Sequence, residues 1–236
     1  MSISVNNVTK LYGSQKALDA VSFDIRKGEI VGFIGPNGAG KSTMMKIITG
    51  FISPDEGSAS VCGLTAGPGA VEMRRMIGYL PENNPLYPEM YVREYLRYVA
   101  DIYKLGLKAK DAVNEVIDRT GLGAEQSKKI GALSKGYRQR VGLAQALIHD
   151  PEVLILDEAT TGLDPNQIIE IRNLISGIGN EKTVIFSTHI MQEVEAICSR
   201  VIIINHGKIV ADGSVAEISS LSGARLEDTF RQLTGK

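Results

Sequence analysis

Hydrophobic and polar residues follow two different periods along the chain. Near the N-terminus they alternate at every second residue in 3–8 and 17–25, which predicts antiparallel strands with a turn at 12–14. Short, mostly apolar runs bounded by glycine, proline or polar residues predict further strands. These strands are 29–34, 58–61, 77–80, 153–156, 183–186, 201–204 and, after a hairpin turn at 205–208, 209–212.

Apolar residues recur at helical spacing between most of these strands. The predicted helices are 42–49, 92–105, 109–120, a segment that begins after Ser134, 166–178, 191–197 and two short helices at the C-terminus. Strands that alternate with helices imply right-handed crossovers. We therefore expect an α/β fold with a mostly parallel sheet that is covered on both faces.

The segment 91–150 breaks this alternation because it carries only helical patterns. Three prolines between 81 and 88 form an extended loop just before it. We expect one domain over 1–236, in which 1–90 and 151–236 form the core, including an N-terminal antiparallel β subdomain. The segment 91–150 is expected to be an inserted helical subdomain.

Composition excludes several classes of protein. The 236 residues are 43% hydrophobic and 22% charged, which suits one large globular domain. Lys plus Arg number 26 against 27 Asp plus Glu, so no strong basic field exists and nucleic acid is not an expected partner. Cys62 and Cys198 lack metal-ligand spacing, and we interpret both as small, buried apolar residues in a reducing compartment.

Location at a membrane would require another chain. No apolar run approaches the ~18 residues that a membrane-spanning helix needs, and the first residues lack the features of a signal peptide. We expect a cytoplasmic protein that does not insert into the membrane directly.

The strongest chemical signal is the glycine-rich segment 35–43, GPNGAGKST. It fits the phosphate-binding P-loop G-x-x-x-x-G-K-[ST], with a predicted strand before it and a helix after it. Glycines let several backbone N–H groups face one anion, and the helix dipole adds to their field. Lys41 is expected to reach the β and γ phosphates. Nucleotide-binding residues expected here are Gly35, Asn37, Gly38, Gly40, Lys41, Ser42 and Thr43, and Ser42 is also expected to ligate Mg²⁺.

Two carboxylates end the apolar run 153–156. A buried strand that ends in Asp157 and Glu158 directs them at the ligand crevice of an α/β sheet. We expect Asp157 to help hold Mg²⁺ through water, and Glu158 to orient and deprotonate an attacking water. The alternative is a strand that ends in solvated acids. Tyr12 is either a hydrophobic strand-end residue or an exposed ring that stacks on adenine, and its position does not decide between these.

Further motifs resemble those of a known family. LSKGYRQR at 133–140 is similar to the signature of the ATP-binding subunits of ABC transporters, TGLD at 161–164 to their D-loop and FSTH at 186–189 to their switch-histidine segment. Tyr12 falls where the family's adenine-stacking aromatic lies. The resemblance covers essentially the whole chain and implies an ABC ATPase, a P-loop NTPase that binds ATP and Mg²⁺ and hydrolyses ATP. Segment 79–87 and the Lys-Gly-Tyr signature most resemble ABC-2 export-type and gliding-motility-associated ATPases.

The resemblance also implies how such a subunit works. Two subunits, identical or different, pack head to tail, with each ATP between 35–43 of one and 134–137 of the other. In that arrangement Ser134 and Gly136 contact the ATP of the partner, and His189 contacts the γ-phosphate. Binding closes the dimer and hydrolysis opens it. The helical insertion and the loop 81–88 would pass this motion to integral membrane transporter subunits, with the ATPase peripheral on the cytoplasmic face.

Some residues depart from the family pattern. In the signature, Lys135 replaces a glycine and Tyr137 a glutamine, although Ser134 and Gly136 remain at a helix start whose dipole can face a phosphate. Lys135 either adds a cation or points to solvent. Glu82 stands where glutamine is usual and brings a carboxylate close to the metal, and Ala159 replaces a proline.

Other classes of function fit part of the sequence. The main alternative is a soluble ABC-type ATPase of a non-transport machine, such as one for cofactor assembly. A binding module without turnover is a second alternative, which Asp157, Glu158 and His189 argue against. A GTPase is disfavoured because the chain lacks the guanine-reading Asn-Lys-x-Asp.

Overall fold

An antiparallel sheet forms one end of the molecule. The computed structural model describes residues 1–221, 223 and 225–235. The strands of this sheet lie in the order β2-β1-β4-β5. They are β1 (Ile3–Tyr12), β2 (Gln15–Ile25), β4 (Glu56–Val61) and β5 (Leu64–Thr65). The antiparallel pairing predicted from the alternation near the N-terminus is confirmed.

The core sheet has the strand order β10-β9-β3-β8-β7-β6. Its strands are β3 (Ile30–Ile34), β6 (Ile77–Leu80), β7 (Val153–Asp157), β8 (Thr183–Ser187), β9 (Arg200–Asn205) and β10 (Lys208–Ser214). Only β10, at one edge, runs antiparallel to its neighbour. The predicted mostly parallel sheet is confirmed. The loops that follow β3, β6, β7 and β8 therefore leave the sheet at the same edge.

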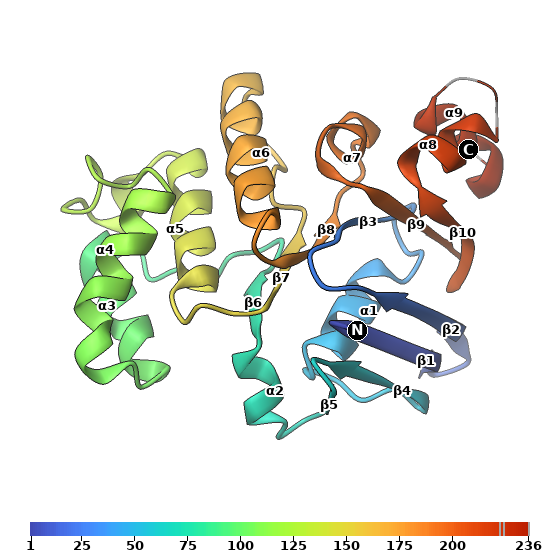
Figure 1. Cartoon of the computed structure of the whole chain (residues 1–236), viewed down its shortest axis with the longest axis horizontal. Helices are drawn as coiled ribbons and strands as arrows, with labels where there is room; N and C mark the ends of the chain where they lie inside the picture. The colour runs from blue at the N-terminus through green and yellow to red at the C-terminus, as the bar shows by residue number, and fades with distance from the viewer. Residues whose placement is uncertain (222, 224, 236) are drawn as a thin grey trace.

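Helices cover both faces of the core sheet (Figure 1). They are α1 (Lys41–Ile48), α2 (Val71–Arg75), α3 (Val92–Ile102), α4 (Ala109–Arg119), α5 (Lys135–Leu147), α6 (Pro165–Gly179), α7 (Met191–Ile197), α8 (Val215–Ser220) and α9 (Leu226–Thr234). Short 3₁₀ turns lie at Gly106–Lys108 and Ile130–Ala132. Helix α1 packs against both sheets, while α3, α4 and α5 lie together at the other end of the molecule and are called the helical insertion below.

Strand β7 contributes side chains to a hydrophobic core on each face of the core sheet. All five of its residues are buried. Leu154 and Leu156 belong to the apolar core that includes the helical insertion, whereas Val153 and Ile155 belong to the core that contains α1 and the antiparallel sheet. Successive side chains of a strand point to opposite faces, so a strand covered on both faces must be apolar throughout.

Two short elements and one burial state differ from the sequence predictions. Strand β5 and helix α2 were not predicted, because two and five residues carry too little periodicity to detect. The prediction that Cys62 is buried is wrong: it is exposed. Cys62 and Gly63, with φ of 50° and 79°, form the tight turn between β4 and β5, which places the side chain outside the core. Cys198 is buried as expected.

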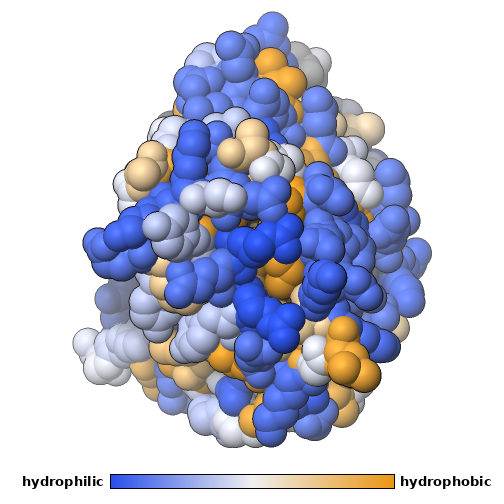
Figure 2. All heavy atoms as spheres, turned by 90° about the vertical axis from the view of Figure 1, so that its left-hand side faces the viewer, coloured by the Kyte–Doolittle hydropathy of each residue, from blue (hydrophilic) through white to orange (hydrophobic). Residues whose placement is uncertain are grey.

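None of the helices in the part of the chain that the structure describes is both long enough and apolar enough to cross a membrane. The surface of the molecule on the side of the helical insertion is mostly hydrophilic, with hydrophobic residues scattered over it (Figure 2).

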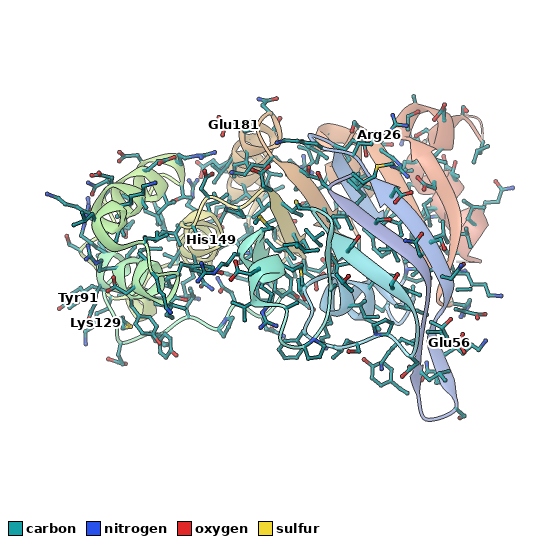
Figure 3. The ribbon with its side chains drawn as sticks, turned by 60° about the horizontal axis from the view of Figure 1, so that its bottom comes forward. Arg26, Glu56, Tyr91, Lys129, His149 and Glu181 are labelled. Carbon is teal, nitrogen blue, oxygen red and sulfur yellow. The ribbon has the colours of Figure 1, made fainter. Side chains whose placement is uncertain are left out.

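His149 connects the helical insertion to the core sheet (Figure 3). Its ring stacks on Tyr103, which follows α3, with 3.8 Å between the ring centroids and 3° between the planes. Its Nε2–H donates to the carbonyl oxygen of Ile77 in β6 at 3.0 Å. One side chain thus contacts both parts of the molecule.

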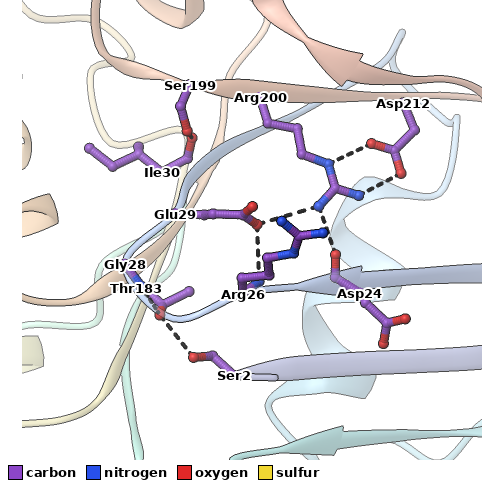
Figure 4. Close-up of polar contacts among 10 residues, drawn as sticks. All are labelled: Ser2, Asp24, Arg26, Gly28, Glu29, Ile30, Thr183, Ser199, Arg200 and Asp212. Carbon is purple, nitrogen blue, oxygen red and sulfur yellow. Dashed lines mark hydrogen bonds and ion pairs between the residues drawn. The ribbon is translucent and has the colours of Figure 1, made fainter.

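Arg200 joins the core sheet to the antiparallel sheet (Figure 4). From β9, its Nε and Nη2 donate to the two carboxylate oxygens of Asp212 in β10, both at 2.7 Å. Its Nη1 donates to the carbonyl oxygen of Asp24 in β2 at 2.8 Å and lies 3.4 Å from a carboxylate oxygen of Glu29. A planar guanidinium can satisfy several acceptors in this way, whereas an ammonium cannot.

Candidate active site

The loops that follow the parallel strands open onto one cleft of about 730 Å³. The glycine-rich loop 35–43 after β3 forms one part of its lining. The other sequence-predicted residues on its walls are Tyr12, Glu82, Asp157, Glu158 and His189. The cleft therefore brings together nearly all of the residues that the motifs predicted.

Glycine is required at two points of the P-loop. A Cβ on Gly35 would lie 2.3 Å from the carbonyl oxygen of Ile204. Gly40 has φ of 113° and precedes α1, and a Cβ there would lie 2.6 Å from the carbonyl oxygen of Ala17. Neither site admits a side chain without movement of the backbone. The loop therefore adopts a path that leaves the first N–H groups of α1 without partners inside the helix, a site suited to an anion.

Lys41 is held by its own loop. Its side chain is buried, and Nζ donates to the carbonyl oxygen of Gly35 at 2.6 Å and to that of Pro36 at 3.3 Å. These bonds fix the ammonium beside the start of α1. The result is a preorganised positive site in the cleft.

Three carboxylates face the same cleft. Burial raises the pKa of Asp157, and the negative charges of Glu158 and Glu82 act in the same direction, while Lys41 opposes them. Among the described residues, no group of three or more His, Cys, Asp or Glu side chains could hold a metal alone. A bound cation would favour the ionised form of Asp157 against both effects, and Mg²⁺ commonly uses only one or two protein carboxylates with phosphate oxygens.

Glu158 and His189 form a hydrogen-bonded pair. His189 Nδ1 lies 2.8 Å from Glu158 Oε2, which also accepts from the Thr161 hydroxyl at 2.8 Å. A carboxylate only accepts, so Nδ1 carries the proton and, in the neutral ring, Nε2 is the acceptor nitrogen. The Glu158 side chain is 12% exposed and that of His189 56%. Glu158 has φ of 54°, a left-handed conformation that turns the chain sharply after β7.

Ser134 and Gly136 do not line the cleft of their own chain. Ser134 caps α5, because its hydroxyl accepts from the backbone N–H of Tyr137 at 3.3 Å. Gly136 is buried against Gln167. Lys135 is exposed, yet its ammonium lies against the D-loop: a Cβ on Gly162 would be 2.1 Å from its Nζ.

Three residues of the cleft were missed by the sequence analysis. Gln15 and Ala17 enter it from β2, which begins directly after the turn beyond Tyr12. Phe230 enters it from α9 near the C-terminus. No motif marks these residues, because their place depends on how the β subdomain and α9 pack on the core.

Tyr12 is both a strand-end residue and an exposed ring, and its stacking on adenine stays a prediction. It is the last residue of β1, and its side chain is also half exposed, on the wall of the cleft. Lys10 Nζ lies 6.0 Å from the centre of its ring.

The arrangement of loop, carboxylates and histidine is that of a nucleotide-hydrolysing P-loop protein. Residues 18–161, more than half of the chain, match the family model described as ABC transporter. The chain therefore belongs to the ABC transporter family.

Two relatives are similar in sequence to most of this chain. The chain is 40% identical over 212 residues to the bacitracin transport ATP-binding protein BcrA of Bacillus licheniformis, which covers 89% of this chain and 69% of the relative. It is 37% identical over 214 residues to the Nod factor export ATP-binding protein I of Burkholderia orbicola (strain AU 1054), which covers 90% of this chain and 70% of the relative.

Solved structures share the fold. The structure of the ATP-binding subunit of an ABC transporter superposes with a TM-score of 0.88 at 31% identity and covers 99% of both chains. The ATP-binding cassette MJ0796, solved as a dimer in a post-hydrolysis state with ADP and Pi, gives 0.81 at 27% identity and covers 90% of this chain and 98% of that one. The chain is an ATP-binding, ATP-hydrolysing subunit of a transporter.

Proposed function

We propose that this subunit drives export as a head-to-tail dimer on the cytoplasmic face of a membrane. One observation carries the proposal: the cleft holds the P-loop, Glu158 and His189, whereas Ser134 and Gly136 lie outside it. A second subunit would supply its own Ser134 and Gly136 to each cleft. Export is supported by the name of the Nod factor export relative, and transport by that of BcrA.

Binding of ATP is assigned to the loop 35–43, Lys41 and Tyr12. The N–H groups at the start of α1 and the Lys41 ammonium would hold the β and γ phosphates by charge-assisted hydrogen bonds. Tyr12 is half exposed on the cleft wall and offers a ring face for adenine. These contacts position the triphosphate so that its γ-phosphorus faces Glu158.

Hydrolysis is assigned to Glu158 with His189. Glu158 would orient a water molecule and accept its proton as the water oxygen bonds to the γ-phosphorus and the bond to the ADP oxygen breaks. The hydrogen bonds from His189 and Thr161 hold the Glu158 carboxylate in one orientation. Because Nδ1 donates to Glu158, Nε2 of His189 is left to face the nucleotide. In the neutral ring Nε2 would accept a hydrogen bond from the water, and it would donate to a γ-phosphate oxygen only in the protonated ring.

The residues present fit Mg²⁺ beside the phosphates. Ser42, Asp157 and Glu82 line the same cleft and would hold it, with Asp157 acting through water. Bound Mg²⁺ would neutralise charge on the β and γ phosphates. Burial and the charges of Glu158 and Glu82 raise the pKa of Asp157, and a cation beside these oxygen donors in the shared cleft would offset both effects.

The helical insertion offers a surface for the membrane subunits. Tyr87 in the loop after β6 packs edge-on against Tyr98 of α3, with 5.9 Å between the ring centroids, and lies 6.0 Å from Tyr95. Tyr87, Tyr91 and Tyr98 are each about half exposed, at 53%, 48% and 44%. Tyrosine is enriched at protein interfaces, and Tyr87 lies on the loop that also carries Glu82.

The experiment is the substitution Glu158→Gln. We expect turnover to fall at least about 100-fold while ATP still binds, and the purified chain to become a dimer when saturated with ATP and Mg²⁺. Light scattering and a phosphate-release assay measure both. Glu152→Gln is the matched control, because Glu152 is an exposed carboxylate just before β7 and should change neither property. A Glu158→Gln protein that stays monomeric would overturn the dimer proposal, and undiminished hydrolysis would remove Glu158 from its role.

A further inference from the structure

Glu193 is a completely buried carboxylate that does not line the nucleotide cleft. It lies on α7, and its exposed fraction is 0%. Oε2 accepts hydrogen bonds from the hydroxyls of Thr160 and Thr188, both at 2.8 Å. Its other oxygen, Oε1, is buried without a hydrogen-bond partner among the described residues. Burial of a carboxylate is costly unless its hydrogen bonds compensate, and here both bonds to Oε2 come from buried threonine hydroxyls.

The two threonines occupy the loops that carry the catalytic pair. Thr160 is two residues after Glu158, and Thr188 is the residue before His189. Both are 1% exposed. Strands β7 and β8 are parallel neighbours, with Asp157 opposite Ser187, so both loops leave the sheet side by side. Glu193 is therefore bonded to both loops at once.

Each loop is also bonded internally around its threonine. The backbone N–H of Thr161 donates to the carbonyl oxygen of Glu158 at 3.1 Å, which closes the turn that contains Thr160. The N–H of Ile190 donates to the Thr188 hydroxyl oxygen at 3.1 Å, which fixes the backbone on either side of His189. Movement of either threonine would therefore move its catalytic neighbour.

We propose that Glu193 is a positioning residue for ATP hydrolysis. Through Thr160 and Thr188 it sets the separation of the two loops and keeps Glu158 Oε2 and His189 Nδ1 at 2.8 Å. Among the described residues, Glu193 forms no hydrogen bond with the P-loop or with any other residue that lines the cleft. It therefore acts on turnover and not on nucleotide affinity. This rests on the proposed roles of Glu158 and His189.

Two substitutions of Glu193 separate geometry from stability. Glu193→Met keeps the length of the side chain but accepts no strong hydrogen bond, while Glu193→Gln keeps an oxygen that can accept from both hydroxyls. We expect Glu193→Met to lower kcat about tenfold or more with KM for MgATP changed by less than about threefold. Glu193→Gln should keep kcat within about threefold, even if its unmatched amide lowers the melting temperature.

The NMR signal of His189 gives a direct readout of position. The chain has three histidines, so the imidazole signals can be assigned one by one. The His189 signal should shift in Glu193→Met and return in Glu193→Gln, whereas that of the exposed His206 should not move. Glu195→Met is the matched control: it makes the same change at an exposed position of α7 and likewise removes an acceptor, here of the backbone N–H of Leu226 at 3.2 Å. It should leave kcat and the His189 signal unaltered.

The outcomes are distinct. Unchanged kcat and His189 signal in folded Glu193→Met would overturn the proposal, as would a loss of kcat that Glu193→Gln shares in full. If Glu193→Met does not fold, Thr160→Val and Thr188→Val, which each remove one hydroxyl, carry the same test. Glu158→Gln is run in the same assay: if it retains turnover, the proposed function fails and the Glu193 proposal with it, and if it is inactive, the result concerns Glu193 alone.

Discussion

At the scale of single residues, His149 makes the stability of the junction between the helical insertion and the core sheet depend on pH. Burial lowers the pKa of His149 to about 4, and its hydrogen bond to the carbonyl of Ile77 only partly opposes this. Lys182 lowers the pKa further and Asp150 raises it. Nδ1 of the ring is buried without a partner among the described residues, so a second ring proton would have no acceptor.

The consequence is a loss of stability on acidification. Above its ordinary pKa of 6.5, His149 is neutral in both folded and unfolded chains. Between 6.5 and about 4 only the unfolded chain takes up the proton, so the free energy of unfolding should fall by about 1.4 kcal/mol per pH unit. Urea unfolding at about pH 7 and about pH 5 measures this fall.

A comparison of variants isolates the contribution of His149. His149→Gln does not titrate, so it should lose this part of the pH dependence. His206→Gln replaces an exposed histidine and should retain it. Equal pH dependence in the wild type and His149→Gln would contradict the assignment.

The shared location of the motif residues could be predicted from the sequence, and their roles stay predictions. Gly35, Lys41, Asp157 and Glu158 were placed correctly in one cleft, because the spacing of a P-loop and the end of an apolar strand specify local backbone geometry. Phe230 could not be found in this way, since a lone aromatic on an amphipathic helix is ordinarily a core residue. The same holds for Glu193, whose burial depends on the packing of α7.

At the scale of elements, long periodic segments were predictable and junctions were not. The burial of β7 and β2 could be predicted from their own residues, because β7 is apolar as far as Leu156 and β2 alternates between apolar and polar residues. Helix α3 was predicted to continue to residue 105 but ends at Ile102, because Lys104 adopts a left-handed φ of 57°. The sequence does not reveal this break, because apolar residues continue the helical pattern beyond it.

The contacts of Arg200, in β9, predict how strongly it stabilises the junction of three strands, β9, β10 and β2. Arg200→Lys keeps the charge but loses the paired bonds to Asp212 and the bond to the Asp24 carbonyl. Arg200 is 23% exposed, so we expect the free energy of unfolding to fall by about 2 kcal/mol. Urea unfolding measures it.

Arg231→Lys is the matched control for Arg200→Lys. Arg231 pairs with Glu227 on the surface of α9, where both side chains are about half exposed, and its replacement should cost less than about 0.5 kcal/mol. If the two substitutions cost the same, Arg200 does not join the sheets in the way described.

For the whole molecule, the division of the site between two chains can be tested by mixing two inactive variants. Lys41→Ala removes the phosphate-binding ammonium. Ser134→Asp keeps a side chain that caps α5 but places a negative charge against the partner's triphosphate. In any dimer of one variant alone, both sites are defective. Ser134→Asn caps the helix without the charge and should retain most of the activity.

A head-to-tail dimer that contains one chain of each variant has one doubly defective site and one intact site, formed by the P-loop of the Ser134→Asp chain and the Ser134 of the Lys41→Ala chain. An equal mixture gives such dimers half of the time, so it should recover about one quarter of the wild-type rate of phosphate release if the sites act independently. A chain that forms its complete site alone gains nothing from mixing. A mixture no more active than the two separate proteins would therefore show that Ser134 does not serve a partner's nucleotide.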